Sequence, residues 1–75
     1  MQKVCFMNHQ MILYIPIDEI MYLQWRNRKL YVYTKDTVYP VSGYLKQYNY
    51  LTKYHFKKIN RNTMMNYNVI TYLDK

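Results

Sequence analysis

Phe56-Lys57-Lys58-Ile59-Asn60-Arg61-Asn62-Thr63-Met64-Met65-Asn66 is the most informative stretch of this chain. Apolar residues at both ends enclose three adjacent polar side chains, and we expect these anchors to hold Asn60, Arg61 and Asn62 outward. Arginine can donate two hydrogen bonds to guanine in the major groove, and asparagine can pair in the same way with adenine. The triplet therefore provides candidates for contact with DNA bases. The alternative is that the asparagines cap a turn and Arg61 is simply solvated.

Two groups of basic residues accompany the triplet. Lys57 and Lys58 precede it and are suited to phosphate contacts, which position a protein on DNA without specifying sequence. Farther upstream, Arg26-Asn27-Arg28-Lys29 interrupts two apolar runs and predicts a four-residue hairpin loop with three positive charges. By itself this loop is an ordinary charged hairpin tip.

The order and spacing of the stretch resemble the F-x-R-x-H-R-S-x-L-V-N run of the LytTR family of bacterial DNA-binding domains. Asp18 to Leu23 is similar to the family's D-D-I-x-Y-I-E, and Tyr33 to Asp36 to its H-T-x-D-G. The hydrophobic positions of its helix match Leu45, Tyr48 and Leu51. The motif positions matched within the first stretch are Phe56, Lys58, Arg61, Met64, Met65 and Asn66. The resemblance covers roughly residues 15–73.

This resemblance implies a small, elongated β-sandwich that approaches double-stranded DNA with loops at one end. By its spacing, the loop Arg26 to Lys29 is similar to another DNA-facing loop of the family, so contact with the DNA backbone is expected there. The predicted function is therefore sequence-specific DNA binding by a small transcriptional regulator. Asn60 and Asn62 stand where the family has His and Ser, so a different base preference is expected. A second interpretation keeps the fold but not DNA reading: a protein-interaction module, or an antagonist that pairs with a full-length relative.

The family continues beyond the position of Tyr72 with a last hairpin that carries a basic DNA-contacting residue, whereas this chain stops at Lys75. We therefore expect a LytTR-like domain over residues 1–75 that is truncated at the C-terminal hairpin. Such a truncation leaves a sheet edge unpaired, and an unpaired edge favours pairing with another chain. A homodimer is accordingly expected.

Composition supports a single basic domain. Seventy-five residues suffice for one small core. Eleven Lys and Arg against four Asp and Glu give a net charge of +7, which favours a polyanionic partner such as nucleic acid. The charge could also serve only solubility.

Hydrophobic patterning predicts a mainly β fold with one α-helix. A polar break at residues 8–10 separates the first two strands, and Pro40 suggests an edge position or a strand end for the fifth. Ser42 is a suitable N-cap for a helix over residues 43–53, whose buried stripe leaves Tyr50 and Tyr54 facing outward. The expected strands are residues 3–7, 11–15, 21–25, 30–34 and 38–41, the Met64-Met65 pair and residues 69–73, with a helical turn at 18–20.

Several functional classes lack support in the sequence. One cysteine excludes an internal disulfide and a cysteine-based zinc site, and two separated histidines with four carboxylates provide no standard metal or catalytic spacing. The single glycine excludes a glycine-rich phosphate loop. We expect no catalytic residues, cofactor, metal or small-molecule substrate. The longest apolar stretch, residues 11–17, is too short for a membrane span, and no signal peptide is evident, so a cytoplasmic protein is expected.

Overall fold

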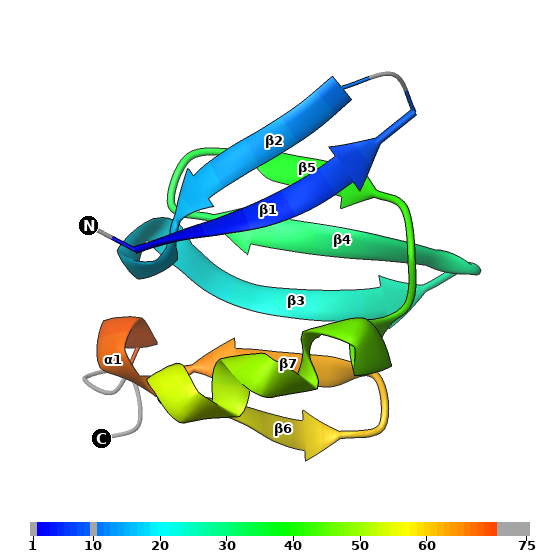
Figure 1. Ribbon diagram of the computed structural model, residues 1–75. Helices are drawn as coiled ribbons and strands as arrows, with labels where there is room; N and C mark the ends of the chain where they lie inside the picture. Colours follow the sequence, from blue (N-terminus) through cyan, green and yellow to red (C-terminus); the bar gives the residue numbers. More distant parts are fainter. Residues whose placement is uncertain (1, 10, 71–75) are drawn as a thin grey trace.

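Two antiparallel sheets account for most of the computed structural model, which describes residues 2–9 and 11–70 (Figure 1). A two-stranded sheet pairs β1 with β2, and a five-stranded sheet has the order β5-β4-β3-β7-β6. The strands are β1 (Lys3–Asn8), β2 (Met11–Pro16), β3 (Ile20–Arg26), β4 (Lys29–Thr34), β5 (Val38–Val41), β6 (Phe56–Asn60) and β7 (Thr63–Asn66). The helical segments are η1 (Ile17–Glu19), η2 (Leu45–Tyr54) and α1 (Tyr67–Ile70). The mainly β prediction is confirmed, including the edge position of the strand that contains Pro40.

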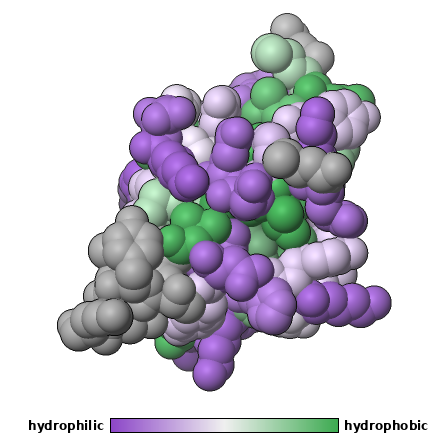
Figure 2. All heavy atoms as spheres, turned by 90° about the vertical axis from the view of Figure 1, so that its left-hand side faces the viewer, coloured by the Kyte–Doolittle hydropathy of each residue, from purple (hydrophilic) through white to green (hydrophobic). Residues whose placement is uncertain are grey.

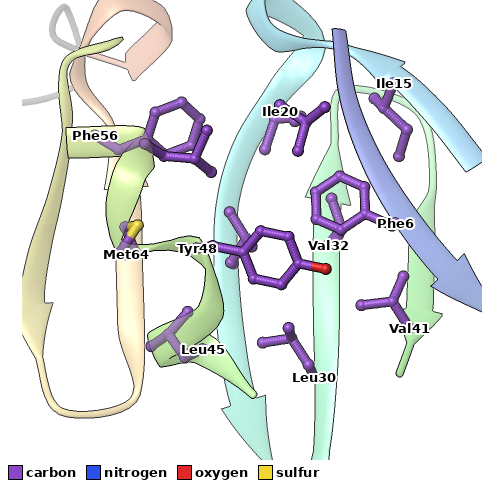
Figure 3. Close-up of a cluster of buried hydrophobic side chains, with 13 residues drawn as sticks. Phe6, Ile15, Ile20, Leu30, Val32, Val41, Leu45, Tyr48, Phe56 and Met64 are labelled. Atoms are coloured by element: carbon purple, nitrogen blue, oxygen red, sulfur yellow. The ribbon is translucent and has the colours of Figure 1, made fainter. Parts of the chain in front are cut away.

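The core lies between one face of the five-stranded sheet and a cover formed by the β1–β2 hairpin and η2 (Figure 3). Leu23 is paired with Val32 on one side and with Met64 on the other, and all three side chains are fully buried. From the cover, Phe6 and Tyr48 bring their rings to 5.0 Å between centroids. Successive strand residues point to opposite faces, so alternate residues of β4 enter the core, whereas a register shift in β3 spaces its two buried residues, Ile20 and Leu23, three positions apart.

The predicted α-helix over residues 43–53 is wrong in type and in its start. Residues 45–54 instead form a 3₁₀ helix, with a non-helical residue at Tyr48 (φ −109°, ψ 16°). The buried residues Leu45, Tyr48 and Leu51 recur every third position, which is the period of a 3₁₀ helix rather than of an α-helix. Gly43 has a φ of +102°, which a helix does not allow, so the helix begins only after it.

The start of this helix is capped by Tyr44 and not by Ser42. The Tyr44 backbone N–H donates to Oε1 of Gln47 at 2.6 Å, and the Gln47 backbone N–H donates to the Tyr44 carbonyl at 3.0 Å. Tyr50 faces outward as predicted. Tyr54, predicted to face outward, is half-buried against the core, and its hydroxyl accepts a hydrogen bond from Gln2 at 3.2 Å.

The predicted strand over residues 69–73 is also wrong in its described part. Val69 and Ile70 belong to α1, and residues 71–73 lie outside the described residues. The Oδ1 atom of Asn66 accepts the backbone N–H of Asn68 at 3.1 Å, which turns the chain into a helix at the end of β7. Asn66, the last residue of the family motif, thus ends β7, the strand that contains Met64 and Met65.

Candidate nucleic-acid interface

Four connections between strands and helices lie at one end of the molecule, on the right in Figure 1. Strands β1, β3, β5 and β6 all end there, because antiparallel pairing reverses the direction of the chain at each step. The connections are the β1–β2 turn with His9, the β3–β4 turn Asn27–Arg28, the β5–η2 segment Ser42–Tyr44 and the β6–β7 turn Arg61–Asn62. We call this the turn end.

The β3–β4 turn is shorter than the predicted four-residue loop. Arg26 and Lys29 form the last pair of the ladder, so only Asn27 and Arg28 remain in the turn. Both have positive φ, 52° and 62°, as a tight two-residue hairpin requires. Asparagine tolerates this conformation, whereas arginine at positive φ is strained. The two-residue turn places the Arg28 side chain at the tip of the hairpin, exposed to solvent.

Replacing Arg28 by glycine is expected to stabilise the fold and to weaken nucleic-acid binding. Relief of the positive φ should raise the free energy of unfolding by about 1 kcal/mol, because glycine adopts this conformation without a steric penalty. Urea denaturation measures the first effect and a titration with duplex DNA the second. Arg28→Ala, which removes the charge but keeps the strain, is the matched control. A glycine variant that is less stable than the alanine variant would contradict the role assigned to strain.

The β6–β7 turn is ordered by its own asparagine. Oδ1 of Asn60 accepts the backbone N–H of Asn62 at 2.8 Å, the hydrogen bond that short polar side chains make in turns. This is the turn-capping alternative considered for the triplet, and it occupies the oxygen that a paired contact with adenine would need. Asn60, Arg61 and Asn62 are all exposed. Arg61 and Asn62 lie at the tip, between the last paired residues Asn60 and Thr63.

The β3–β4 and β6–β7 turns lie side by side. Strand β3 pairs with β7 up to Gln24 and Thr63, and the ladder is extended by a hydrogen bond from the Trp25 N–H to the Asn62 carbonyl at 2.8 Å. Arg28 and Arg61 therefore project from the same end of one sheet. This is the arrangement that simultaneous contact with one duplex would require.

An aromatic pair stands at the centre of the turn end, with basic residues on both sides. Trp25 is half-buried against the core, and its ring lies 5.2 Å from the ring of Tyr44, which is 59% exposed. The pair lines a shallow cavity of about 230 Å³ together with His9, Arg28, Lys29 and Ser42, among other residues. It also lines a second cavity of about 270 Å³ together with Leu45, Lys46, Lys58, Arg61 and Asn62.

Lys46 is the main basic residue that sequence reasoning missed. The first turn of η2 places it in the same cavity lining as Lys58 and Arg61. The signal was available in the order of the elements. Neighbouring strands of an antiparallel sheet run in opposite directions, so β5 runs in the same direction as β3 and ends beside the β3–β4 turn. The helix that follows β5 therefore begins at the turn end.

Two predicted contact residues do not join the cluster at the turn end. Phe56 is buried, so alternation along β6 places Lys58 on the face of the sheet that the β1–β2 hairpin and η2 cover. Lys57 lies on the opposite face, which we call the open face. Arg26 also lies on the open face. Its guanidinium sits 4.1 Å from the Tyr31 ring, and its Nε donates to the Tyr33 hydroxyl at 3.1 Å, which raises the pKa of Arg26.

The acidic residues among the described positions lie at the end of the molecule opposite the turn end. Figure 2 views the molecule from that opposite end. Asp18 and Glu19 form η1, and Asp36 lies in the β4–β5 turn. Over residues 2–9 and 11–70, no acidic side chain is located in the four connections of the turn end. The opposite end also carries Lys35, in the turn with Asp36, and Lys53, near the end of η2, so its charge is mixed. The connections of the turn end carry cations without carboxylates, and an anion would be attracted there.

Other kinds of site find no support among the described residues. No group of three His, Cys, Asp or Glu side chains is arranged there to hold a metal ion. In the same part of the chain, no helix has the length and hydropathy needed to span a membrane.

Comparisons with known proteins identify the family. The sequence model of the LytTr DNA-binding domain matches residues 10–75. No curated protein matches the sequence significantly. Among solved structures, a LytTr DNA-binding domain from Bacillus cereus superposes with a TM-score of 0.73 at 23% sequence identity, covering 91% of this chain. The chain spans 63% of the length of that structure. The family match over most of its residues shows that this chain belongs to the LytTR family of DNA-binding domains.

Proposed function

We propose that this protein binds double-stranded DNA sequence-specifically through its turn end and acts in the cytoplasm as a small transcriptional regulator. The observation that carries the proposal is the adjacency of two cationic turns, bridged by the hydrogen bond from Trp25 to Asn62, at an end whose connections contain no acidic residue. Membership of a DNA-binding family supports it. The partner is duplex DNA, without a cofactor or small-molecule substrate.

In this proposal the residues of the turn end have two roles, contact with bases and contact with the DNA backbone. Arg61 and Asn62 contact bases, because they form the exposed tip and Oδ1 of Asn60 is engaged in holding the turn. Asn60 contributes through its amide nitrogen, which can still donate a hydrogen bond. The other exposed residues of the turn end contact the DNA backbone through charge or hydrogen bonding: Asn27, Arg28, Lys29, Lys46 and Lys58.

The residues on the open face of the sheet are proposed to have a more distant role. Arg26 and Lys57 add positive charge on the open face of the sheet, where they steer DNA without touching it closely. Arg26 is held back by Tyr31 and Tyr33, so contact with a phosphate at the turn end would require it to leave both partners.

A second candidate function rests on that same open face. Tyr22 and Tyr33 stack there at 4.2 Å between ring centroids, and Tyr31 lies beside them in β4. None of these rings is fully buried. An aromatic sheet face can contact another protein, as a LytTR-fold interaction module or antagonist would require. In that case the protein would pair with a relative without reading DNA itself.

Salt dependence of DNA affinity distinguishes the two functions. Each phosphate neutralised by a Lys or Arg lowers the slope of log affinity against log salt by about 0.9, so we expect a slope of roughly −3 to −6. Fluorescence anisotropy with a labelled duplex at several salt concentrations measures it. Affinity without salt dependence, or no binding at low salt, would overturn DNA binding and favour the interaction module.

Two lysines of the same helix provide a matched pair of variants for this titration. Lys46→Ala at the start of η2 should flatten the slope by about 0.9, because that residue lies at the turn end. Lys53→Ala removes the same charge near the other end of η2 and should leave the slope unchanged. Equal effects of the two substitutions would mean that net charge alone attracts DNA, with no defined contact end.

A further inference from the structure

The free edges of the two sheets differ in how well they are protected against pairing with another chain. Natural edge strands usually carry proline, charged side chains or bulges, each of which hinders the addition of a further strand. Strand β5 has Pro40, which lacks an N–H group. Strand β6 has Lys57 and Lys58 and a register shift between Lys58 and Asn60. Strand β2 has none of these features before its final residue, Pro16.

Strand β2 is joined on one side only. It pairs with β1 over its whole length, from Met11 opposite Asn8 to Pro16 opposite Lys3. On its other side, no strand among the described residues pairs with it. Three of its apolar side chains are unusually exposed: Met11 at 61%, Ile12 at 54% and Tyr14 at 64%. The edge therefore offers unpaired backbone groups flanked by apolar side chains.

Charge indicates what can cover this edge. Residues 4–17, which include all of β2, contain no charged side chain, although the chain carries a net charge of +7. A second copy carries the same excess charge, so most contacts between copies would bring like charges together. The uncharged hairpin is a part of the structure where two copies can meet without that repulsion. An acidic partner or an anionic membrane would instead favour surfaces that carry cations.

We propose that two copies of this chain pair through β2, antiparallel across a twofold axis, to form a four-stranded sheet of order β1-β2-β2-β1. The axis makes the contact self-complementary, because the same strand supplies both sides. On the outer face of the hairpin, Ile12 lies opposite Met7 and Tyr14 opposite Cys5. Dimerisation joins the two outer faces into one continuous apolar strip.

This pairing fixes the direction of the two turn ends. Strand β2 begins at the turn end and finishes beside η1 at the other end (Figure 1). Antiparallel pairing turns one copy end for end, so the two turn ends point in opposite directions. A dimer of this kind holds two separate duplexes rather than two adjacent half-sites of one. This consequence rests on the proposed DNA binding, whereas the dimer itself does not.

The first test measures oligomeric state without DNA. Light scattering after size-exclusion chromatography should give about twice the mass of one chain for the unmodified protein. The double variant Ile12→Lys, Tyr14→Lys should give the mass of one chain, because it places cations on the two outer-face positions of the edge strand. Val38→Lys is the matched control: it adds a lysine at a 44% exposed position of β5 and should remain dimeric. A monomeric parent protein, or a dimer that only Val38→Lys disrupts, would overturn the proposal.

The native cysteine locates the interface. Cys5 is the only cysteine of the chain and is exposed on β1, so it accepts a spin label without any substitution. In the proposed sheet, the two β1 strands are three strand spacings apart, about 14 Å. Dipolar spectroscopy should therefore show a short distance between labels that disappears in the Ile12→Lys, Tyr14→Lys variant. A dimer with only long distances between labels would place the interface elsewhere.

Bridging of two duplexes is tested separately. Beads that carry one duplex should retain a second, labelled duplex when the unmodified protein or Val38→Lys is added. The monomeric double variant should bind a single duplex but lose this retention. Loss of single-duplex binding in every variant would contradict the proposed DNA function and leave the light-scattering result to decide the dimer. Retention by the monomeric variant would contradict the orientation of the two ends.

Discussion

Replacing Arg61 by alanine is expected to weaken binding to the preferred duplex by about 1–3 kcal/mol, which is roughly a factor of 5 to 150 in affinity. Arg61 stands at the tip of the β6–β7 turn, exposed and held by the hydrogen bond between Asn60 and Asn62. A guanidinium in this position can donate two parallel hydrogen bonds to guanine, and alanine removes both. Selection of bound fragments from a random DNA pool first identifies the preferred duplex. Titration of that duplex and of a scrambled one then measures the effect.

Neighbouring lysines provide the controls. Lys58→Ala removes a charge that lines the same cavity as Arg61, and it should weaken the preferred and scrambled duplexes equally, as expected of a phosphate contact. Lys57→Ala removes the same charge from the open face and should have a smaller effect on both. If Arg61→Ala weakens both duplexes to the same extent, Arg61 contacts phosphate and not a base.

Replacing Asn66 by alanine is expected to lower the free energy of unfolding by about 2–4 kcal/mol, because it leaves several buried polar groups without hydrogen-bond partners. The side chain is 2% exposed. Its Nδ2 donates to the carbonyls of Ile20 at 2.9 Å and Ile17 at 3.1 Å, and its Oδ1 accepts from the N–H of Asn68. This one amide connects β7, the start of α1 and the η1–β3 junction. Domains of this size have total stabilities near the lower end of about 5–15 kcal/mol, so the loss would be a large part of the whole.

Urea denaturation followed by circular dichroism measures this loss. Asn68→Ala is the matched control. It removes a neighbouring, exposed side-chain amide but keeps the backbone N–H that donates to Asn66, so it should change stability little. Asn66→Asp should be worse at pH 7 than at pH 4, because a buried carboxylate facing two carbonyl oxygens has a raised pKa and is favoured only when protonated. Similar stability of Asn66→Ala and the parent protein would show that water replaces the lost hydrogen bonds.

Hydrophobic and turn patterns predicted most strands correctly. They predicted the wrong element where the same residues fit two kinds of secondary structure. Alternation and turn residues located β1 to β5 to within one or two residues. The spacing of Leu45, Tyr48 and Leu51 was interpreted as an α-helix, although its period of three matches the 3₁₀ helix that forms. Val69 was assigned to a strand because apolar residues follow it. The hydrogen bond from Asn68 to Asn66, which starts a helix there, leaves no mark in hydrophobic pattern.

The sequence alone determined the family, the two cationic turns and the residues at their tips, because turn residues and strand periodicity act over a few positions. Only the tertiary structure decided which charges act together. It joined Lys46 to Arg61 and separated Lys57 from Lys58. It also laid Arg26 against Tyr31. These outcomes depend on the pairing of β3 with β7, whose partners Gln24 and Thr63 lie far apart in the chain. Such pairing is selected by burial of a shared core, which no short stretch of residues specifies.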